Sequence, residues 1–64
     1  MSNKIRIALD VMGGDQAPEM VIAGTAEAQL RYPNAEFILF GPRSRIEEEL
    51  VKFPALASQV TIEH

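Results

Sequence analysis

Residues 9–18 read LDVMGGDQAP, and they decide the fold because a pair of glycines stands between an apolar run and a proline. Glycines remove side chains from the backbone, so the chain either bends sharply here or is approached closely by another group. Proline suits the first position of a helix, where its missing N–H costs nothing. The stretch therefore predicts a strand that turns into a helix beginning at Pro18.

The flanking residues support that prediction. Residues 4–10, KIRIALD, carry large apolar side chains at alternate positions, as a strand with one buried face does. A helix over residues 18–31 would bring four residues to one face, namely Val21, Ile22, Thr25 and Ala28. We expect a strand over residues 4–10 and a helix over residues 18–31.

The rest of the chain repeats this alternation. Residues 36–40, EFILF, form a continuous apolar run, which predicts a strand covered on both faces. The motif SRIE at residues 44–47 matches a capping box, so a second helix should start near Ser44 and end before Pro54. Residues 60–63, VTIE, predict a third strand. The order is that of a β-α-β-α-β portion of a parallel α/β sheet.

This sheet is small for a self-sufficient domain. The chain has 64 residues and no cysteine that could form a disulfide. Two helices on three strands would leave a sheet edge open and the surface of Phe37, Leu39 and Phe40 poorly covered. We therefore expect residues 1–64 to be the N-terminal part of a single larger α/β domain.

Charge and composition narrow the classes of partner. The net charge is −3, and the lysines and arginines are scattered, which argues against a nucleic-acid partner. The opening residues have neither a signal peptide's cleavage site nor the length of a membrane span, so a cytoplasmic location is expected. The only histidine is His64 and two nearby aspartates are too few ligands, so no metal is expected.

The glycine pair has two interpretations. Ligands of open α/β sheets bind beyond the carboxyl ends of the strands, and Gly13 and Gly14 would let a phosphate or carboxylate approach a helix N-terminus. Asp10 and Asp15 oppose an anion there. In the alternative, the glycines only supply positive φ, Asp15 caps the helix and Asp10 binds loop amides. The stretch contains neither the dinucleotide fingerprint nor a P-loop motif.

Charged residues after the second predicted strand are also candidates. Arg43 and Arg45 should lie at the same edge of the sheet as the glycines, where they are either solvated or a counter-charge to an anion. Glu47, Glu48 and Glu49 are expected to form a solvated helix face.

Residues 7–24, IALDVMGGDQAPEMVIAG, resemble the N-terminal signature of the bacterial phosphate acyltransferases of phospholipid synthesis, also called fatty acid/phospholipid synthesis proteins. The shared core is Asp10-x-Met12-Gly13-Gly14-Asp15-x-Ala17-Pro18. Residues 37–50, FILFGPRSRIEEEL, resemble the family's next strand, turn and helix, although Gly-Asp is commoner there than Gly41-Pro42. The resemblance covers essentially the whole chain, whereas family chains are several-fold longer.

The resemblance implies an enzyme that transfers a long-chain acyl group from acyl-acyl carrier protein to inorganic phosphate. The acyl phosphate produced serves a membrane-bound glycerol-3-phosphate acyltransferase in phospholipid synthesis. It also implies a three-layer α/β/α Rossmann-like sheet related to isopropylmalate dehydrogenase, a homodimer peripherally associated with the membrane, and no cofactor. Residues 1–64 alone should be inactive.

The resemblance makes Asp10, Gly13, Gly14 and Asp15 the residues expected to line the substrate site, and it names no general acid. Phosphate attack on a thioester needs donors for the developing oxyanion, and the amides of Gly13 and Gly14 are candidates. Two other functions remain open. One is a non-catalytic interaction module that pairs through the sheet edge and a face bearing Phe37 and Phe40. The other is a phosphate-handling acyltransferase of the phosphotransacetylase type.

Overall fold

The computed structural model describes residues 5–14 and 17–63, which form a three-stranded sheet and three helices. The strands are β1 (Arg6–Asp10), β2 (Glu36–Phe40) and β3 (Val60–Glu63), paired in parallel in the order β1-β2-β3. Helix α1 (Pro18–Arg31) joins β1 to β2, and α2 (Arg43–Leu50) and α3 (Pro54–Ala57) join β2 to β3. The predicted β-α-β-α-β portion of a parallel α/β sheet is confirmed.

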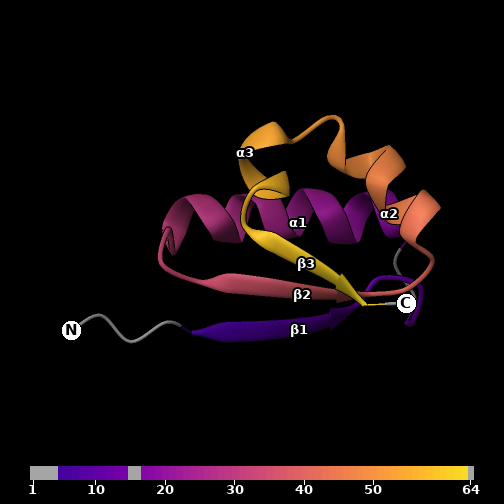
Figure 1. Cartoon of the computed structure of the whole chain (residues 1–64), viewed down its shortest axis with the longest axis horizontal. Coiled ribbons are helices and arrows are strands. Elements are labelled where there is room, and N and C mark those ends of the chain that lie inside the picture. Colours follow the sequence, from indigo (N-terminus) through magenta and orange to yellow (C-terminus); the bar gives the residue numbers. More distant parts are fainter. Residues whose placement is uncertain (1–4, 15–16, 64) are drawn as a thin grey trace.

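All three helices lie on one face of the sheet (Figure 1). The strands succeed one another in a single direction across the sheet, and crossovers of one hand then place every connecting helix on the same side. The covered side is called the inner face below. The other side, called the bare face, carries the following side chains of the three strands: Arg6, Ala8, Asp10, Glu36, Ile38, Phe40, Thr61 and Glu63.

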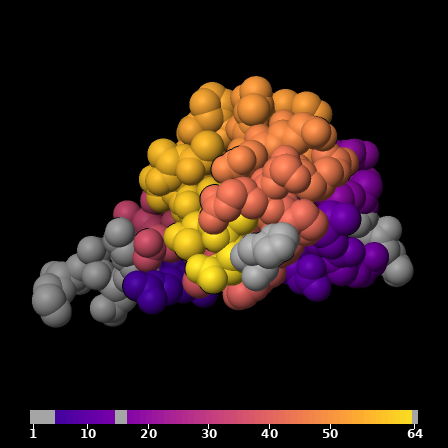
Figure 2. Space-filling view, turned by 45° about the vertical axis from the view of Figure 1, so that its right-hand side comes forward, coloured from indigo at the N-terminus to yellow at the C-terminus, as the bar shows by residue number. Residues whose placement is uncertain are grey.

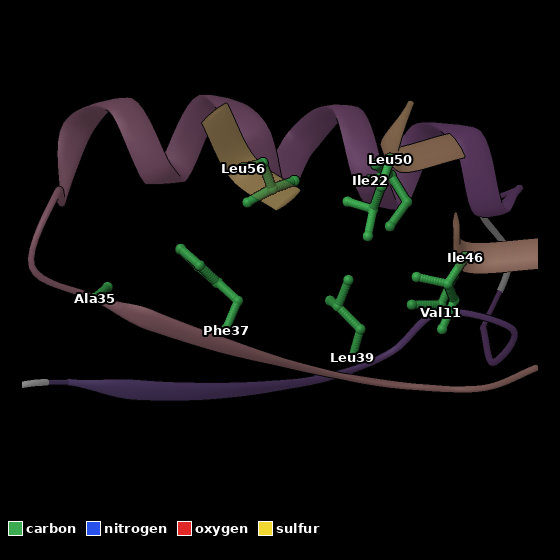
Figure 3. Close-up of a cluster of buried hydrophobic side chains, with 8 residues drawn as sticks. All are labelled: Val11, Ile22, Ala35, Phe37, Leu39, Ile46, Leu50 and Leu56. Carbon is green, nitrogen blue, oxygen red and sulfur yellow. The ribbon is translucent and has the colours of Figure 1, made fainter. Parts of the chain in front are cut away.

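The core lies between the inner face and the helices (Figure 3). Phe37 and Leu39 of β2 point up into it, and Ile22 of α1 and Leu56 of α3 meet them from above. The buried hydrophobic residues of the described chain are Val11, Ile22, Ala35, Phe37, Leu39, Ile46, Leu50 and Leu56. β2 supplies the centre of this core because it is the middle strand.

Helix α1 has the bounds that the sequence predicts. Ile22 and Thr25 are buried, and Val21 and Ala28 pack against the core, so the predicted face is confirmed. The hydroxyl of Thr25 donates to the carbonyl of Val21 at 2.7 Å, which satisfies a polar group that would otherwise be buried unpaired.

The prediction that β2 is covered on both faces is wrong within the described residues. Phe37 and Leu39 face the helices and are 1% and 0% exposed, whereas Phe40 faces the opposite way and is 44% exposed. Phe37 and Leu39 are therefore well covered, contrary to expectation. No surface carries both Phe37 and Phe40, because residues at odd spacing along a strand point to opposite sides of the sheet. The face postulated for an interaction module does not exist.

The capping box at residues 44–47 is also not formed. Helix α2 begins at Arg43, its N-cap is Pro42, and no side chain caps it. The helix ends at Leu50 rather than continuing to Phe53, and Pro54 then opens α3. Proline halts one helix but is equally suited to the first turn of the next, which explains the missed element.

Candidate functional site

The loops that follow β1 and β2 lie together at the carboxyl edge of the sheet. The amide of Val11 donates to the carbonyl of Phe40 at 2.9 Å, and the amide of Gly41 donates to the carbonyl of Glu63 at 3.0 Å. These two bonds join the ends of all three strands. Figure 2, which brings this end forward, shows the purple atoms of the first loop and α1 next to the orange atoms that follow β2.

Asp10 shapes the first of these loops, residues 10–14, which we call the glycine turn. Its Oδ1 accepts hydrogen bonds from the amides of Met12 at 3.2 Å and Gly13 at 3.0 Å. A carboxylate that accepts from the backbone two and three residues further on folds the chain into an Asx-type turn. The role proposed for Asp10 as the residue that binds loop amides is confirmed.

Gly13 is needed because the Asp10 carboxylate lies against it. A Cβ added at Gly13 would be 2.8 Å from the Asp10 Cγ and closer still to Oδ2. Gly13 does not have a positive φ, so its requirement is one of space. Its amide is already bonded to Asp10 and is not a free donor for a substrate.

Gly14 is needed for its conformation and stands beside open space. Its φ is +86°, a value that side-chain-bearing residues rarely adopt, and a Cβ added there would have no atom within 4 Å. Its amide has no acceptor within residues 5–14 and 17–63. Of the four predicted site residues, Asp10, Gly13 and Gly14 come together in the glycine turn, whereas Asp15 lies outside the described residues.

The start of α1 completes this edge without a side-chain cap. Ala17 is the N-cap, Pro18 occupies the first turn, and the carbonyl of Ala17 accepts from the amides of Met20 and Val21 at 2.9 and 3.2 Å. Glu19 adds a negative charge to the first turn. The N-terminus of α1 is therefore a weaker anion-binding site than a helix start at which all of the first amides are free.

Arg43 and Arg45 are both engaged by the protein. Arg43 donates to the carbonyl of Ile62 at 3.1 Å and pairs with Glu47 at 3.6 Å. Arg45 reaches three carboxylates, at 2.7 Å for Glu49, 3.1 Å for Glu48 and 3.2 Å for Glu19. Neither guanidinium is simply solvated, and neither is presented to an anion at the glycine turn.

The cluster of Arg45 with Glu19, Glu48 and Glu49 links the first turn of α1 to α2. Glu49 is only 5% exposed and also accepts from Lys52 at 3.2 Å, so the prediction of a wholly solvated Glu47–Glu49 face is wrong. The hydrogen bond from Arg45, followed by that from Lys52, lowers the pKa of Glu49, and the bond to Glu49 raises the pKa of Arg45. The i,i+4 spacing of Arg45 and Glu49 was the sequence signal for this pair.

The described residues hold no group of three or more histidine, cysteine, aspartate or glutamate side chains arranged to bind a metal ion. In the same part of the chain, no helix is both long and apolar enough to cross a membrane.

The fold and the glycine turn define an α/β protein of the open-sheet class, with a strand-turn-helix loop at the carboxyl edge of the sheet, the edge at which proteins of this class bind their ligands. Residues 5–64 match the family model described as "Fatty acid synthesis protein", and the chain belongs to this family.

Curated relatives carry the name phosphate acyltransferase. Over 64 residues the chain is 48% identical to that of Rhodospirillum centenum, 50% to that of Rhodopseudomonas palustris strain BisB5 and 52% to that of Bradyrhizobium diazoefficiens. Each alignment covers 100% of this chain and 18% of the relative, so the chain spans under a fifth of the length of these proteins. No solved structure matches the chain significantly.

Proposed function

We propose that residues 1–64 form the N-terminal part of a larger α/β catalytic domain that transfers a long-chain acyl group from acyl-acyl carrier protein to inorganic phosphate. The acyl phosphate formed would be used in phospholipid synthesis. The observation that carries the proposal is the glycine turn, which stands at the carboxyl edge of a parallel sheet in a chain about half identical to phosphate acyltransferases. We expect the 64 residues alone to be inactive, because the described residues supply candidates for only part of the reaction.

The reaction sets three demands. A phosphate oxygen must be held at the thioester carbon, the developing oxyanion must be stabilised, and the departing thiolate of the carrier must be protonated. The described residues offer candidates for the first two only. We assign the general acid to the rest of the domain.

Gly14 is the residue best placed to serve the substrate. Its amide has no acceptor in the described part of the chain, and a Cβ added there would meet no atom within 4 Å, its chain neighbours aside. A backbone amide in such a position can donate to a phosphate oxygen or to the oxyanion at close range. Gly13 supports it by leaving space for the carboxylate that shapes the turn.

Asp10 is a positioning residue in this proposal. The amides of Met12 and Gly13 donate to one oxygen of its carboxylate, so part of its charge is satisfied within the turn. This lessens the repulsion that a phosphate would otherwise meet. We retain Asp15 as a proposed site residue on the strength of the sequence resemblance.

The proposed partners are acylated carrier protein and inorganic phosphate, with a second copy of the chain in a homodimer. A membrane-bound glycerol-3-phosphate acyltransferase would consume the product, so the enzyme would work in the cytoplasm at the membrane surface. No metal or organic cofactor enters the proposal.

A chimera tests this function. Residues 1–64 replace the matched segment of the Bradyrhizobium diazoefficiens relative, and the purified protein is given palmitoyl-acyl carrier protein and phosphate. We expect acyl phosphate, trapped as its hydroxamate, together with release of free carrier thiol. Omission of phosphate, or the 64-residue chain alone, should give neither product. A folded chimera that makes no acyl phosphate would contradict the proposal, and one that prefers acetyl donors would favour the phosphotransacetylase alternative.

A further inference from the structure

Glu19 carries a negative charge close to the glycine turn. It lies in the first turn of α1, a few residues after Gly14, whose amide has no acceptor in the described part of the chain. A carboxylate in the first turn of a helix is attracted by the backbone amides and the positive dipole end there. A free Glu19 carboxylate would therefore compete with a phosphate for the same groups.

Arg45 holds this carboxylate toward α2. Its Nη2 donates to Glu19 Oε2 at 3.2 Å, whereas its Nη1 donates to Glu49 at 2.7 Å and to Glu48 at 3.1 Å. A guanidinium is planar and rigid, so the bonds of Nη1 also fix the direction of Nη2. Arg45 thus uses one nitrogen as an anchor on its own helix and presents the other to α1.

The anchor of Arg45 is the buried carboxylate of Glu49. One oxygen of Glu49 accepts from Arg45, and the other accepts from Lys52 at 3.2 Å. A buried carboxylate keeps such partners, because the loss of one leaves charge unpaired away from water. The side chain of Arg45 is 31% exposed and that of Glu19 is 55% exposed. The arginine is the more enclosed partner of this pair, and Glu19 is the partner that it restrains.

Helix α2 also packs against the glycine turn. A Cβ added at Gly41, just before α2, would be 3.4 Å from both Met12 Cγ and Ile46 Cδ1. Val11 and Ile46 are both buried in the core at this end of the sheet (Figure 3). Arg45 directly precedes Ile46, so the same part of α2 supports the glycine turn and the first turn of α1.

The surroundings of Arg45 do not suit a direct counter-charge for phosphate. Its guanidinium is bonded to three carboxylates, which outnumber the positive charges of Arg45 and Lys52 in this cluster. An anion would find no surplus of positive charge there. Any effect of Arg45 on phosphate must therefore pass through the position of Glu19.

We propose that Arg45 is a positioning residue for phosphate binding: it holds the Glu19 carboxylate against α2, which leaves the amides of the glycine turn and of the start of α1 to the substrate phosphate. This rests on the proposed function, in which phosphate binds at the glycine turn. Arg45 itself touches no substrate. The direction of its Nη2, and not its charge alone, is the property that matters.

Arg45→Lys in the chimera separates direction from charge. Lysine keeps the positive charge and can pair with Glu49, but its single ammonium lacks the second arm that reaches Glu19. We expect the KM for phosphate to rise about two- to fivefold, the factor that a carboxylate at a helix N-terminus is worth. The kcat and the KM for acyl-acyl carrier protein should not change. Arg43→Lys is the matched control, because Arg43 contacts Glu47 and Ile62, and it should leave all three constants unchanged.

The same substitution in a Glu19→Gln chimera identifies the competing acid. There, Arg45→Lys should leave the KM for phosphate unchanged, because the carboxylate that it would release has been removed. An unchanged KM in Arg45→Lys alone would overturn the proposal. An equal rise with and without Glu19→Gln would also overturn it, since Arg45 would then act on phosphate directly.

Isothermal titration calorimetry with inorganic phosphate provides a second measurement. The Kd for phosphate should follow the same pattern across the chimera, both single variants and the double variant. This comparison can be made in a folded chimera that transfers no acyl group, so failure of the proposed function is distinguishable from failure of the role of Arg45. An unsubstituted chimera that binds no phosphate would overturn the role of Arg45.

Discussion

Gly13→Ala should destabilise the protein when Asp10 is present and should stabilise it in the Asp10→Ala variant. The three atoms nearest to a Cβ at Gly13 all belong to the Asp10 carboxylate, and the Cγ would be 2.8 Å away. The carboxylate can swing out to solvent, so the substitution costs the two bonds that it makes rather than a shift of the backbone. Two backbone bonds to this exposed carboxylate contribute about 1–2 kcal/mol.

A second contribution to the stability effect of Gly13→Ala has the opposite sign. Alanine restricts the unfolded chain more than glycine and stabilises a compatible site by about 0.4–1 kcal/mol, and Gly13 has no positive φ to forbid it. Gly13→Ala should therefore destabilise the Asp10 protein by about 0.5–1 kcal/mol, and should stabilise the Asp10→Ala variant by about 0.4–1 kcal/mol. The coupling energy between the two positions is then about 1–2 kcal/mol.

Urea unfolding followed by circular dichroism at 222 nm, on the wild-type chain, both single variants and the double variant, measures this coupling. The reasoning would be refuted if Gly13→Ala destabilised the protein equally with and without Asp10. Additivity to within about 0.5 kcal/mol would mean that the carboxylate does not impose glycine at this position.

Two further predictions concern the core and the ion cluster. Phe37→Ala should cost about 3–5 kcal/mol and abolish the cooperative urea transition, whereas Phe40→Ala, on the bare face, should leave a transition in place. If Phe37→Ala unfolded cooperatively at the same urea midpoint as the wild-type chain, this result would contradict the core described above. Because the pKa of Glu49 is lowered in the fold, its stabilising effect is complete above the ordinary glutamate range and is lost as the pH falls through the lowered pKa. The urea midpoint of Glu49→Gln should therefore fall less than that of the wild type as the pH is lowered. The same dependence of the midpoint on pH in both proteins would contradict the pairing of Glu49 with Arg45.

The strand and helix order could be predicted from the sequence because its signals are local. Alternation in β1, the proline at the start of α1 and the apolar run of β2 each act within a few residues. Two features of the helices were missed, because a proline near a helix end is compatible with more than one helix start. The capping box failed because α2 already begins at Arg43, with Pro42 as its N-cap, and Pro54, which was expected only to stop a helix, begins α3.

The covering of β2 could not be read from its composition. An apolar run indicates burial on both sides, but which side is buried here depends on all three helices lying on one face. In the glycine turn, the sequence suggested that Asp10 binds loop amides and that the glycines permit a tight turn. It could not separate Gly13, which is needed for space, from Gly14, which is needed for positive φ.

The central claim is that the glycine turn forms one wall of the acyl-transfer site, and Gly14→Asn in the chimera tests it most directly. Asparagine tolerates positive φ, so the turn should be kept while a side chain enters the open space beside the Gly14 amide. We predict an unchanged melting temperature with at least about a tenfold loss of kcat/KM for phosphate, equal to about 1.4 kcal/mol of transition-state stabilisation. Wild-type kinetics in a folded Gly14→Asn chimera would show that the glycine serves only the turn, and would contradict the account.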